Sequence, residues 1–265
     1  MQINAVKTDG FSVDYIKFGS GKRALVIIPG LSVQSVIGSA EAIERAYSVL
    51  KDDFTVYLFD RRKEIYDGYT IRQMAQDTAA AIRSLGLDRV SVFGASQGGM
   101  IAMQMAILYP ELVNKLIVAS SAARVGDDEY KTVARWIALS DAGDAEALYL
   151  DFGEALYPKT IFDSSRELLI AAAATVSQNE LCRFSVLARS LRGFDVLGKL
   201  YKITCPMLAL GDSDDRVLGA GAMEKIGDEM KNVPGFEMYI YSGYGHAVYD
   251  TAPDFKERML AFLKK

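Results

Sequence analysis

Residues 90–99 constrain the fold of this chain more than any other stretch. The run Val90-Ser91-Val92-Phe93 is mostly apolar and β-branched, Gly94-Ala95-Ser96-Gln97-Gly98 follows it, and a long apolar segment begins at Met100. That order predicts a buried strand, a sharp turn and a helix, with the serine in a strained conformation that exposes its hydroxyl. The two glycines of the turn leave room where strand and helix approach each other. We therefore expect Ser96 at the tip of a sheet.

The rest of the chain alternates between strand-like and helix-like segments. A hairpin is predicted near the start, because Asp9-Gly10 is a typical two-residue turn. Strands are expected at Ile3–Lys7, Phe11–Phe18, Ala24–Ile28, Thr55–Phe59, Val90–Phe93, Leu116–Ala119, Cys205–Leu210 and Phe236–Tyr241, and helices at Ala40–Leu50, 70–85, 97–109, Met223–Met230 and Asp254–Leu263. Such alternation predicts an α/β fold with a mostly parallel central sheet flanked by helices.

The alternation stops between residues 124 and 199, where only helices are predicted. Crossovers between parallel strands are usually much shorter, so we interpret this block as a helical cap, or lid, inserted over one end of the sheet. Residues 1–123 and 200–265 would then form the core. A helical layer of the same core is the alternative. The expected helices are Glu129–Leu139, Ala145–Leu156, Ser164–Val176 and Glu180–Leu191, and the candidate pocket-lining residues are Trp136, Phe152, Tyr157, Phe162, Phe184 and Leu187.

Composition and charge exclude several classes of function. Half of the 265 residues are hydrophobic and the net charge is −4; without a basic stripe and interleaved aromatic residues, we expect no nucleic-acid partner. The apolar runs are too short to span a bilayer, and Cys182 and Cys205 form neither a CxxC pair nor a disulfide framework. With no signal-peptide pattern at the start, the expected location is cytoplasmic. The run Asp60-Arg61-Arg62-Lys63 is expected to form a solvated or ion-paired loop.

The chain contains a single histidine, His246. One histidine rules out a histidine-rich metal site, and no carboxylate cluster has metal-ligand spacing, so no metal is expected. His246 follows the last predicted strand, Asp212, Asp214 and Asp215 follow the strand before it, and Ser96 follows a third. Because the carboxyl ends of parallel strands meet at one edge, these groups are expected to converge there. They are the types that nucleophilic catalysis needs, since a serine requires a base and the base an orienting acid.

In its motifs and their order, the chain resembles the α/β-hydrolase-fold serine hydrolases of the esterase type that carry a helical cap. The matching stretches are Ile28-Pro29-Gly30-Leu31, Gly94–Gly99, Leu208–Gly211 through Asp215-Arg216-Val217, and Gly243-Tyr244-Gly245-His246. The resemblance covers nearly the whole chain, and its order is Ser, Asp, His, as in the nucleophile-elbow enzymes. It is specific for the fold and the triad and not for a substrate.

The resemblance implies a catalytic triad. Ser96 is expected to be the nucleophile and His246 the general base, which later acts as the general acid. The acid that orients the imidazole is expected to be Asp215, because Val217 follows it at the position that the family pattern favours. Asp214 fits the family's spacing after the glycine and is the alternative.

The resemblance also implies an oxyanion hole made from backbone groups. Its donors are expected to be the N–H groups of Leu31 and Gln97, the second at the positive end of a helix. Many family members have His-Gly in the oxyanion loop. This chain has Pro29-Gly30, a departure that keeps the backbone donor at Leu31.

The expected function is hydrolysis of a small carboxylic ester or related acyl substrate through an acyl-enzyme on Ser96, as in carboxylesterases (EC 3.1.1 type). Thioester, lactone and carbon–carbon bond hydrolases use the same triad and are alternatives. Another is a small-molecule receptor or binding protein of the same fold with little turnover. No cofactor is expected. The expected partner is a small-molecule acyl substrate, and the chain is expected to be a monomer or a homodimer.

Overall fold

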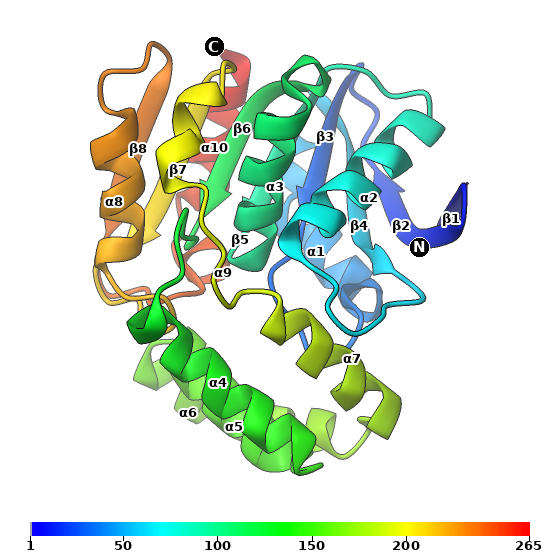
Figure 1. Ribbon diagram of the computed structural model, residues 1–265, viewed down its shortest axis with the longest axis vertical. Coiled ribbons are helices and arrows are strands. Elements are labelled where there is room, and N and C mark those ends of the chain that lie inside the picture. The colour runs from blue at the N-terminus through cyan, green and yellow to red at the C-terminus, as the bar shows by residue number, and fades with distance from the viewer. Residues whose placement is uncertain (1) are drawn as a thin grey trace.

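A computed structural model describes residues 2–265 and contains one eight-stranded sheet in the order β1-β2-β4-β3-β5-β6-β7-β8 (Figure 1). The strands are β1 (Ile3–Thr8), β2 (Phe11–Phe18), β3 (Arg23–Ile28), β4 (Phe54–Arg62), β5 (Val90–Ala95), β6 (Val113–Ala119), β7 (Met207–Asp212) and β8 (Phe236–Tyr241). β1 and β2 pair in antiparallel fashion, β2 runs antiparallel to β4, and the pairs from β4 to β8 are parallel. The predicted mostly parallel sheet is confirmed.

Helices cover both faces of the sheet. Hydrophobic residues of α2 (Ile71–Ser84), α3 (Gln97–Leu108) and α8 (Gly221–Met230) pack on one face, and those of α1 (Ala40–Ala46), α9 (Val248–Thr251) and α10 (Phe255–Lys264) pack on the other. Neighbouring residues of a central strand belong to opposite clusters: Val92 to the first and Phe93 to the second. β5 is buried along its whole length, and its sequence is accordingly mostly apolar.

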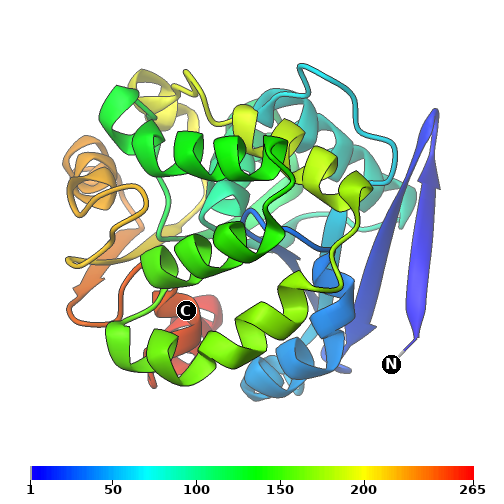
Figure 2. The ribbon, with the colours of Figure 1, turned by 90° about the horizontal axis from the view of Figure 1, so that it is seen from below.

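Between β6 and β7 the chain leaves the sheet and forms a helical layer, consisting of α4 (Asp127–Asp141), α5 (Ala145–Leu156), α6 (Lys159–Ala173) and α7 (Gln178–Arg189). The layer lies below the sheet in Figure 1 and spreads across that end of the molecule in Figure 2. The Phe152 ring lies 4.5 Å from the Trp136 ring and 6.1 Å from the Phe184 ring, centroid to centroid. The layer therefore has aromatic packing of its own. No helix within residues 2–265 is long and apolar enough to cross a membrane.

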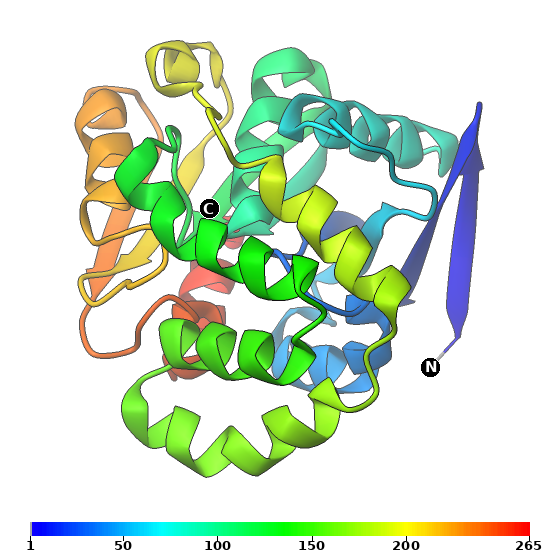
Figure 3. The same ribbon diagram turned by 60° about the horizontal axis from the view of Figure 1, so that its bottom comes forward.

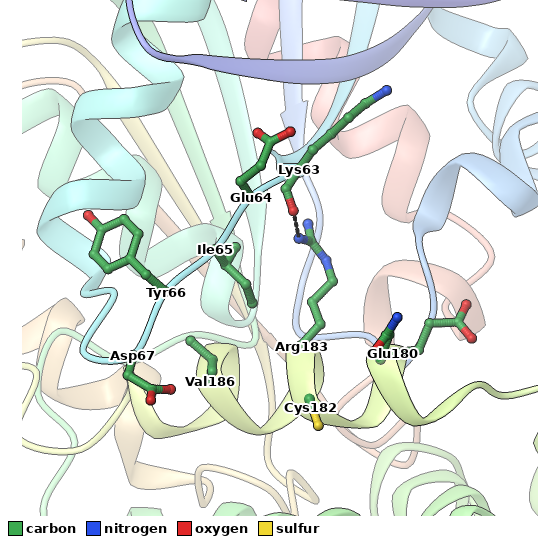
Figure 4. A pocket seen from close by; sticks show the side chains of 10 residues that line it. Lys63, Glu64, Ile65, Tyr66, Asp67, Glu180, Cys182, Arg183 and Val186 are labelled. Atoms are coloured by element: carbon green, nitrogen blue, oxygen red, sulfur yellow. Dashed lines mark hydrogen bonds between the residues drawn. The ribbon is translucent and has the colours of Figure 1, made fainter.

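Arg183 connects α7 to the end of β4 by hydrogen bonds. Arg183 donates hydrogen bonds to the carbonyls of Arg62 at 2.8 Å and Lys63 at 3.0 Å, where β4 ends. Figure 3 shows α7 beside the segment that follows β4, and Figure 4 shows the contact with Lys63. A cavity of about 560 Å³ lies between α7 and residues 63–67. Among the residues described, those that line this cavity include none of the predicted triad, so it is separate from the predicted site.

The charged run after the fourth strand corrects one sequence prediction. We expected a loop at residues 60–63, but β4 continues through Arg62, which pairs with Val13 of β2. The backbone pairing with a neighbouring strand outweighs the low strand preference of charged residues. Arg62 does form an ion pair, 3.4 Å from Asp77. Arg61 is only 6% exposed, so its side chain is in the interior and not in solvent.

Candidate active site

Ser96 lies between the end of β5 and the start of α3. Its backbone has φ 52° and ψ −120°, a conformation that is rare for a residue other than glycine. The Ser96 N–H donates to the carbonyl of Ala119 at 2.8 Å, and the Ser121 hydroxyl donates to the carbonyl of Ser96 at 2.8 Å. These contacts hold the strained turn. The predicted strand, sharp turn and helix are confirmed.

Two glycines make this turn sterically possible. A Cβ atom on Gly94 would lie 2.2 Å from the carbonyl oxygen of Gly98, and one on Gly98 would lie 2.0 Å from the carbonyl oxygen of Ile28. Both obstacles are backbone atoms of the sheet or of α3, which cannot move aside without disturbing the core. The chain therefore needs glycine at both positions so that α3 can begin close against β3 and β5.

The structure brings the three predicted triad side chains into one hydrogen-bonded line. His246 Nε2 lies 2.9 Å from Ser96 Oγ, and His246 Nδ1 lies 2.8 Å from Asp215 Oδ2. All three residues are buried, with exposures of 7% for Ser96, 8% for Asp215 and 1% for His246. When the imidazole is neutral and its Nδ1–H donates to Asp215, Nε2 is left to accept the hydrogen of the Ser96 hydroxyl.

The surroundings of Asp215 favour its ionised form. Burial alone would raise the pKa of this carboxyl, but His246 and the backbone N–H groups of Val217 and Leu218 hold the pKa below its usual value. Those two N–H groups donate to Oδ1 at 2.8 Å and 3.1 Å. One carboxylate oxygen is thus held by the backbone, and the other is left for the imidazole.

The other two aspartates hold the loop that carries the histidine. Asp214 Oδ2 accepts the backbone N–H of Gly243 at 2.7 Å, and Asp212 Oδ2 accepts that of Tyr244 at 3.0 Å. Among residues 2–265, Asp215 supplies the only carboxylate within hydrogen-bond distance of the His246 ring. Of the two candidates that the sequence left open, Asp215 and not Asp214 therefore contacts the histidine.

Two backbone N–H groups near Ser96 donate to no acceptor among residues 2–265. The loop after β3 passes so close to the serine that a Cβ on Gly30 would lie 3.2 Å from Ser96 Cβ. In the described part of the chain, neither the N–H of Leu31 nor that of Gln97 has a hydrogen-bond partner, and both residues are buried. Gln97 is the first residue of α3, at the positive end of the helix. Unpaired donors at this place suit a developing oxyanion.

Arg61 reaches the same place from β4, and the sequence analysis missed it. Its guanidinium Nη2 donates to the carbonyl of Pro29 at 2.7 Å and to Gln97 Oε1 at 3.2 Å. The Gln97 side-chain amide in turn donates to the carbonyl of Leu187 in α7 at 2.8 Å. Burial lowers the pKa of Arg61 to about 10, so the group stays charged at neutral pH. The buried Arg61 guanidinium thus contacts Pro29 and Gln97, and Gln97 connects it to the helical layer.

A cavity of about 510 Å³ adjoins this site. It is lined by Gly30 and Leu31 of the oxyanion loop and by Ala95, the residue before Ser96; Tyr157, at the end of α5, and Asp250 of α9 line it as well. Of the six pocket-lining candidates that we named in the cap, Tyr157 alone lines this cavity, whereas the aromatic residues Trp136, Phe162 and Phe184 are buried in packing.

Comparison with known proteins identifies the family. The family model for the alpha/beta hydrolase fold matches residues 23–157, just over half of the chain. The chain belongs to the alpha/beta hydrolase fold family. The matched part contains the loop of residues 29–31 and the Ser96 turn, and Asp215 and His246 follow it.

Several similar proteins align with most or all of this chain. A protein of Stutzerimonas stutzeri named putative carbamate hydrolase RutD is 25% identical over 240 residues, which are 85% of this chain and 88% of the relative. An esterase from Exiguobacterium antarcticum has a similar structure, with a TM-score of 0.82, 22% identity and full coverage of both chains. An enol-lactonase from Burkholderia xenovorans superposes with a TM-score of 0.84 at 15% identity, covering 99% of this chain and 100% of the lactonase. The structural likenesses show the shared fold.

Proposed function

We propose that this protein is a serine hydrolase that cleaves small carboxylic esters or related acyl compounds through an acyl-enzyme on Ser96. The observation that carries the proposal is the line of hydrogen bonds from Ser96 Oγ through His246 to Asp215, at 2.9 Å and 2.8 Å. Membership in the alpha/beta hydrolase fold family supports hydrolysis as the class of reaction.

In the acylation step, Ser96 Oγ attacks the carbonyl carbon while its proton passes to His246 Nε2. The carbonyl π electrons move to the oxygen, whose negative charge is stabilised by the N–H groups of Leu31 and Gln97. Asp215, held in its ionised form, stabilises the imidazolium. The tetrahedral intermediate then collapses, the carbon–oxygen bond to the alcohol breaks, and the leaving oxygen takes the proton from Nε2.

In the deacylation step, water takes the place of the alcohol. His246 Nε2 removes a proton from the water as its oxygen bonds to the acyl carbon, and the collapse of the second tetrahedral intermediate releases a carboxylic acid. The proton returns from Nε2 to Ser96 Oγ, so the protein is regenerated without any cofactor in the sequence of steps.

Carbamate hydrolysis is a second candidate because the relatives at about 25% identity are named putative carbamate hydrolases. The same residues serve both reactions. A carbamate would place a carbamoyl group on Ser96, which water would then release by the steps above. Thioester and lactone hydrolysis differ only in the leaving group.

The proposal is tested with p-nitrophenyl esters of increasing acyl length and with a p-nitrophenyl carbamate, beside the Ser96→Ala variant. We expect turnover by the wild type and a loss of about 10⁵-fold or more in the variant, because removing the nucleophile removes the covalent pathway. Equal rates for the two proteins, or no turnover of any of these compounds, would refute the serine mechanism. The relative rates on ester and carbamate decide between the two candidates.

A further inference from the structure

The cavity beside the oxyanion loop contains a carboxylate that the reaction above does not use. Asp250 of α9 is the only residue with a charged side chain among the described residues that line this cavity. Much of the remaining lining is aliphatic or aromatic, including Ile27, Val36, Ile43, Leu58 and Phe93. Asp250 is exposed to solvent, so it gives a largely apolar cavity one negative charge that a ligand can reach.

Within residues 2–265, the Asp250 carboxylate has no hydrogen bond and no ion pair. The nearest cationic influence is Lys256 of α10, whose charge lowers the pKa of Asp250 without forming a salt bridge. Burial dominates and raises the pKa to about 6. Asp250 is nevertheless an exposed residue that also lines the cavity, so a ligand in the cavity can reach its carboxylate.

Three tyrosines surround the same space. Tyr47, Tyr157 and Tyr249 all line the cavity, and the charge of Asp250 raises the pKa of each of them after the larger effect of burial. Among the described residues, none of the three hydroxyls has a hydrogen-bond partner. Aromatic rings together with a carboxylate are the combination with which proteins bind ammonium ions.

We propose that this cavity is a subsite for substrates that carry a cationic ammonium group, with Asp250 as the specificity-determining residue. The ammonium would pair with the Asp250 carboxylate among the tyrosine rings, and the aliphatic lining would hold the chain that joins it to the ester. Gly30 and Leu31 line the cavity, so a substrate whose carbonyl oxygen lies at the Leu31 N–H has the cavity beside it. This inference rests on the proposed function of Ser96.

The test uses two pairs of esters that differ only in charge. In the first pair the acyl group is trimethylammonio-butanoyl or its carbon isostere, in which tert-butyl replaces trimethylammonium, with p-nitrophenol as the leaving group. In the second pair the alcohol is choline or its tert-butyl isostere, with butanoate as the acyl group. For each pair, the ratio of kcat/KM for the cationic ester to that for the neutral ester is measured for the wild type and for Asp250→Asn.

We expect the wild type to prefer the cationic ester in at least one pair and Asp250→Asn to lower that ratio by about 10-fold or more. Asp254→Asn is the matched control: it removes the same charge four residues away, at an exposed side chain that pairs with Arg258, and its ratio should equal that of the wild type. A ratio in Asp250→Asn within twofold of the wild type for both pairs would overturn the subsite. Failure of the serine mechanism is distinguishable from failure of the subsite, because in that case Ser96→Ala would hydrolyse both esters as fast as the wild type.

The wild type provides a second measurement that needs no variant. Its cationic-to-neutral ratio should fall as the pH is lowered through about 6, where Asp250 takes up its proton. Using a ratio cancels any effect of pH on the hydrolytic steps that the two esters share. The other titratable groups that face Asp250 are Tyr47, Tyr157, Tyr249 and Lys256, and these stay protonated in this range. A ratio that stays constant from pH 8 to pH 5 would contradict the proposal.

Discussion

Asp215 contacts the His246 ring and Asp250 lies on α9, four residues after the histidine, and the surroundings of the two carboxylates differ sharply. Asp215 accepts hydrogen bonds from His246, Val217 and Leu218, and its pKa is held below the usual value. Asp250 accepts none from residues 2–265, and burial raises its pKa to about 6. Asp215 is only 8% exposed, whereas Asp250 is an exposed residue. The hydrogen-bond donors around Asp215 hold a carboxylate ionised in the interior, and Asp250 has no such donors among residues 2–265.

We interpret this difference as the difference between a residue of the proposed catalytic triad and a residue of the proposed ligand subsite. The donors around Asp215 fix its position and charge before any substrate arrives, as a residue that orients an imidazole requires. Asp250 accepts no such hydrogen bond from residues 2–265, so its carboxylate is available to pair with the proposed ammonium group. The predictions below test this distinction, beginning with the largest expected effect.

Replacing Asp215 with asparagine should lower kcat/KM by about 10⁴-fold for every ester, charged or neutral, because the amide cannot hold the imidazole in the required tautomer. Steady-state kinetics on the two ester pairs measures this. Asp214→Asn is the comparison, since Asp214 contacts the backbone of Gly243 and not the ring; its loss should be roughly 10-fold or less. Comparable losses in the two variants would mean that Asp215 is not the orienting acid.

Arg61→Met should reduce kcat and kcat/KM together by about 10- to 100-fold, with little change in KM. Arg61 holds Pro29 and Gln97, so its loss should misplace the oxyanion donors, which act mainly in the transition state. Arg62→Met is the matched control, because Arg62 pairs with Asp77 instead, and it should remain near the wild-type rate. An increase in KM alone for Arg61→Met would indicate a role in substrate binding instead of donor placement.

Asp250→Asn should make the fold more stable at neutral pH. The pKa of Asp250 is about 6 in the folded protein and about 3.9 in an unfolded chain, so ionisation above pH 6 destabilises the native state. Because solvent reaches the side chain, we expect the variant to gain only about 1 kcal/mol, which is a rise in Tm of roughly 2–4 °C. Below about pH 4 both states bind the proton and the gain should disappear. Asp215→Asn should instead lower Tm at neutral pH, and a gain there would contradict the contrast.

The difference between the two carboxylates also shows what the sequence can predict. Ser96, Asp215 and His246 each follow a strand, and a strand followed by a turn is a local signal that places a residue at the sheet edge. The order of these segments in the sequence was therefore enough to predict that the three side chains lie close together. The glycines of the turn are also a local signal. Gly94 and Gly98 lack side chains where β5 and α3 pack closely, and their positions in the sequence predict this close approach.

The sequence contains no comparable local signal for Arg61 or Asp250. Arg61 belongs to a charged run that is typical of a loop, and its burial depends on the pairing of β4 with β2 and on the position of Gln97. Asp250 is on α9, which is only four residues long and too short to show a helical period. Its cavity is completed by Tyr47 and Tyr157, which come from distant parts of the chain. These surroundings exist only after the chain has packed.

Ser96 as the nucleophile is tested most directly with a fluorophosphonate probe followed by intact-mass and peptide mass spectrometry. We predict one adduct per chain, on the peptide that contains Ser96, and none in Ser96→Ala. In Asp215→Asn the same adduct should form far more slowly, whereas Asp214→Asn should be labelled at a rate much closer to that of the wild type. An adduct on any other residue, labelling that persists in Ser96→Ala, or a wild-type protein that stays unlabelled would contradict the role proposed for Ser96.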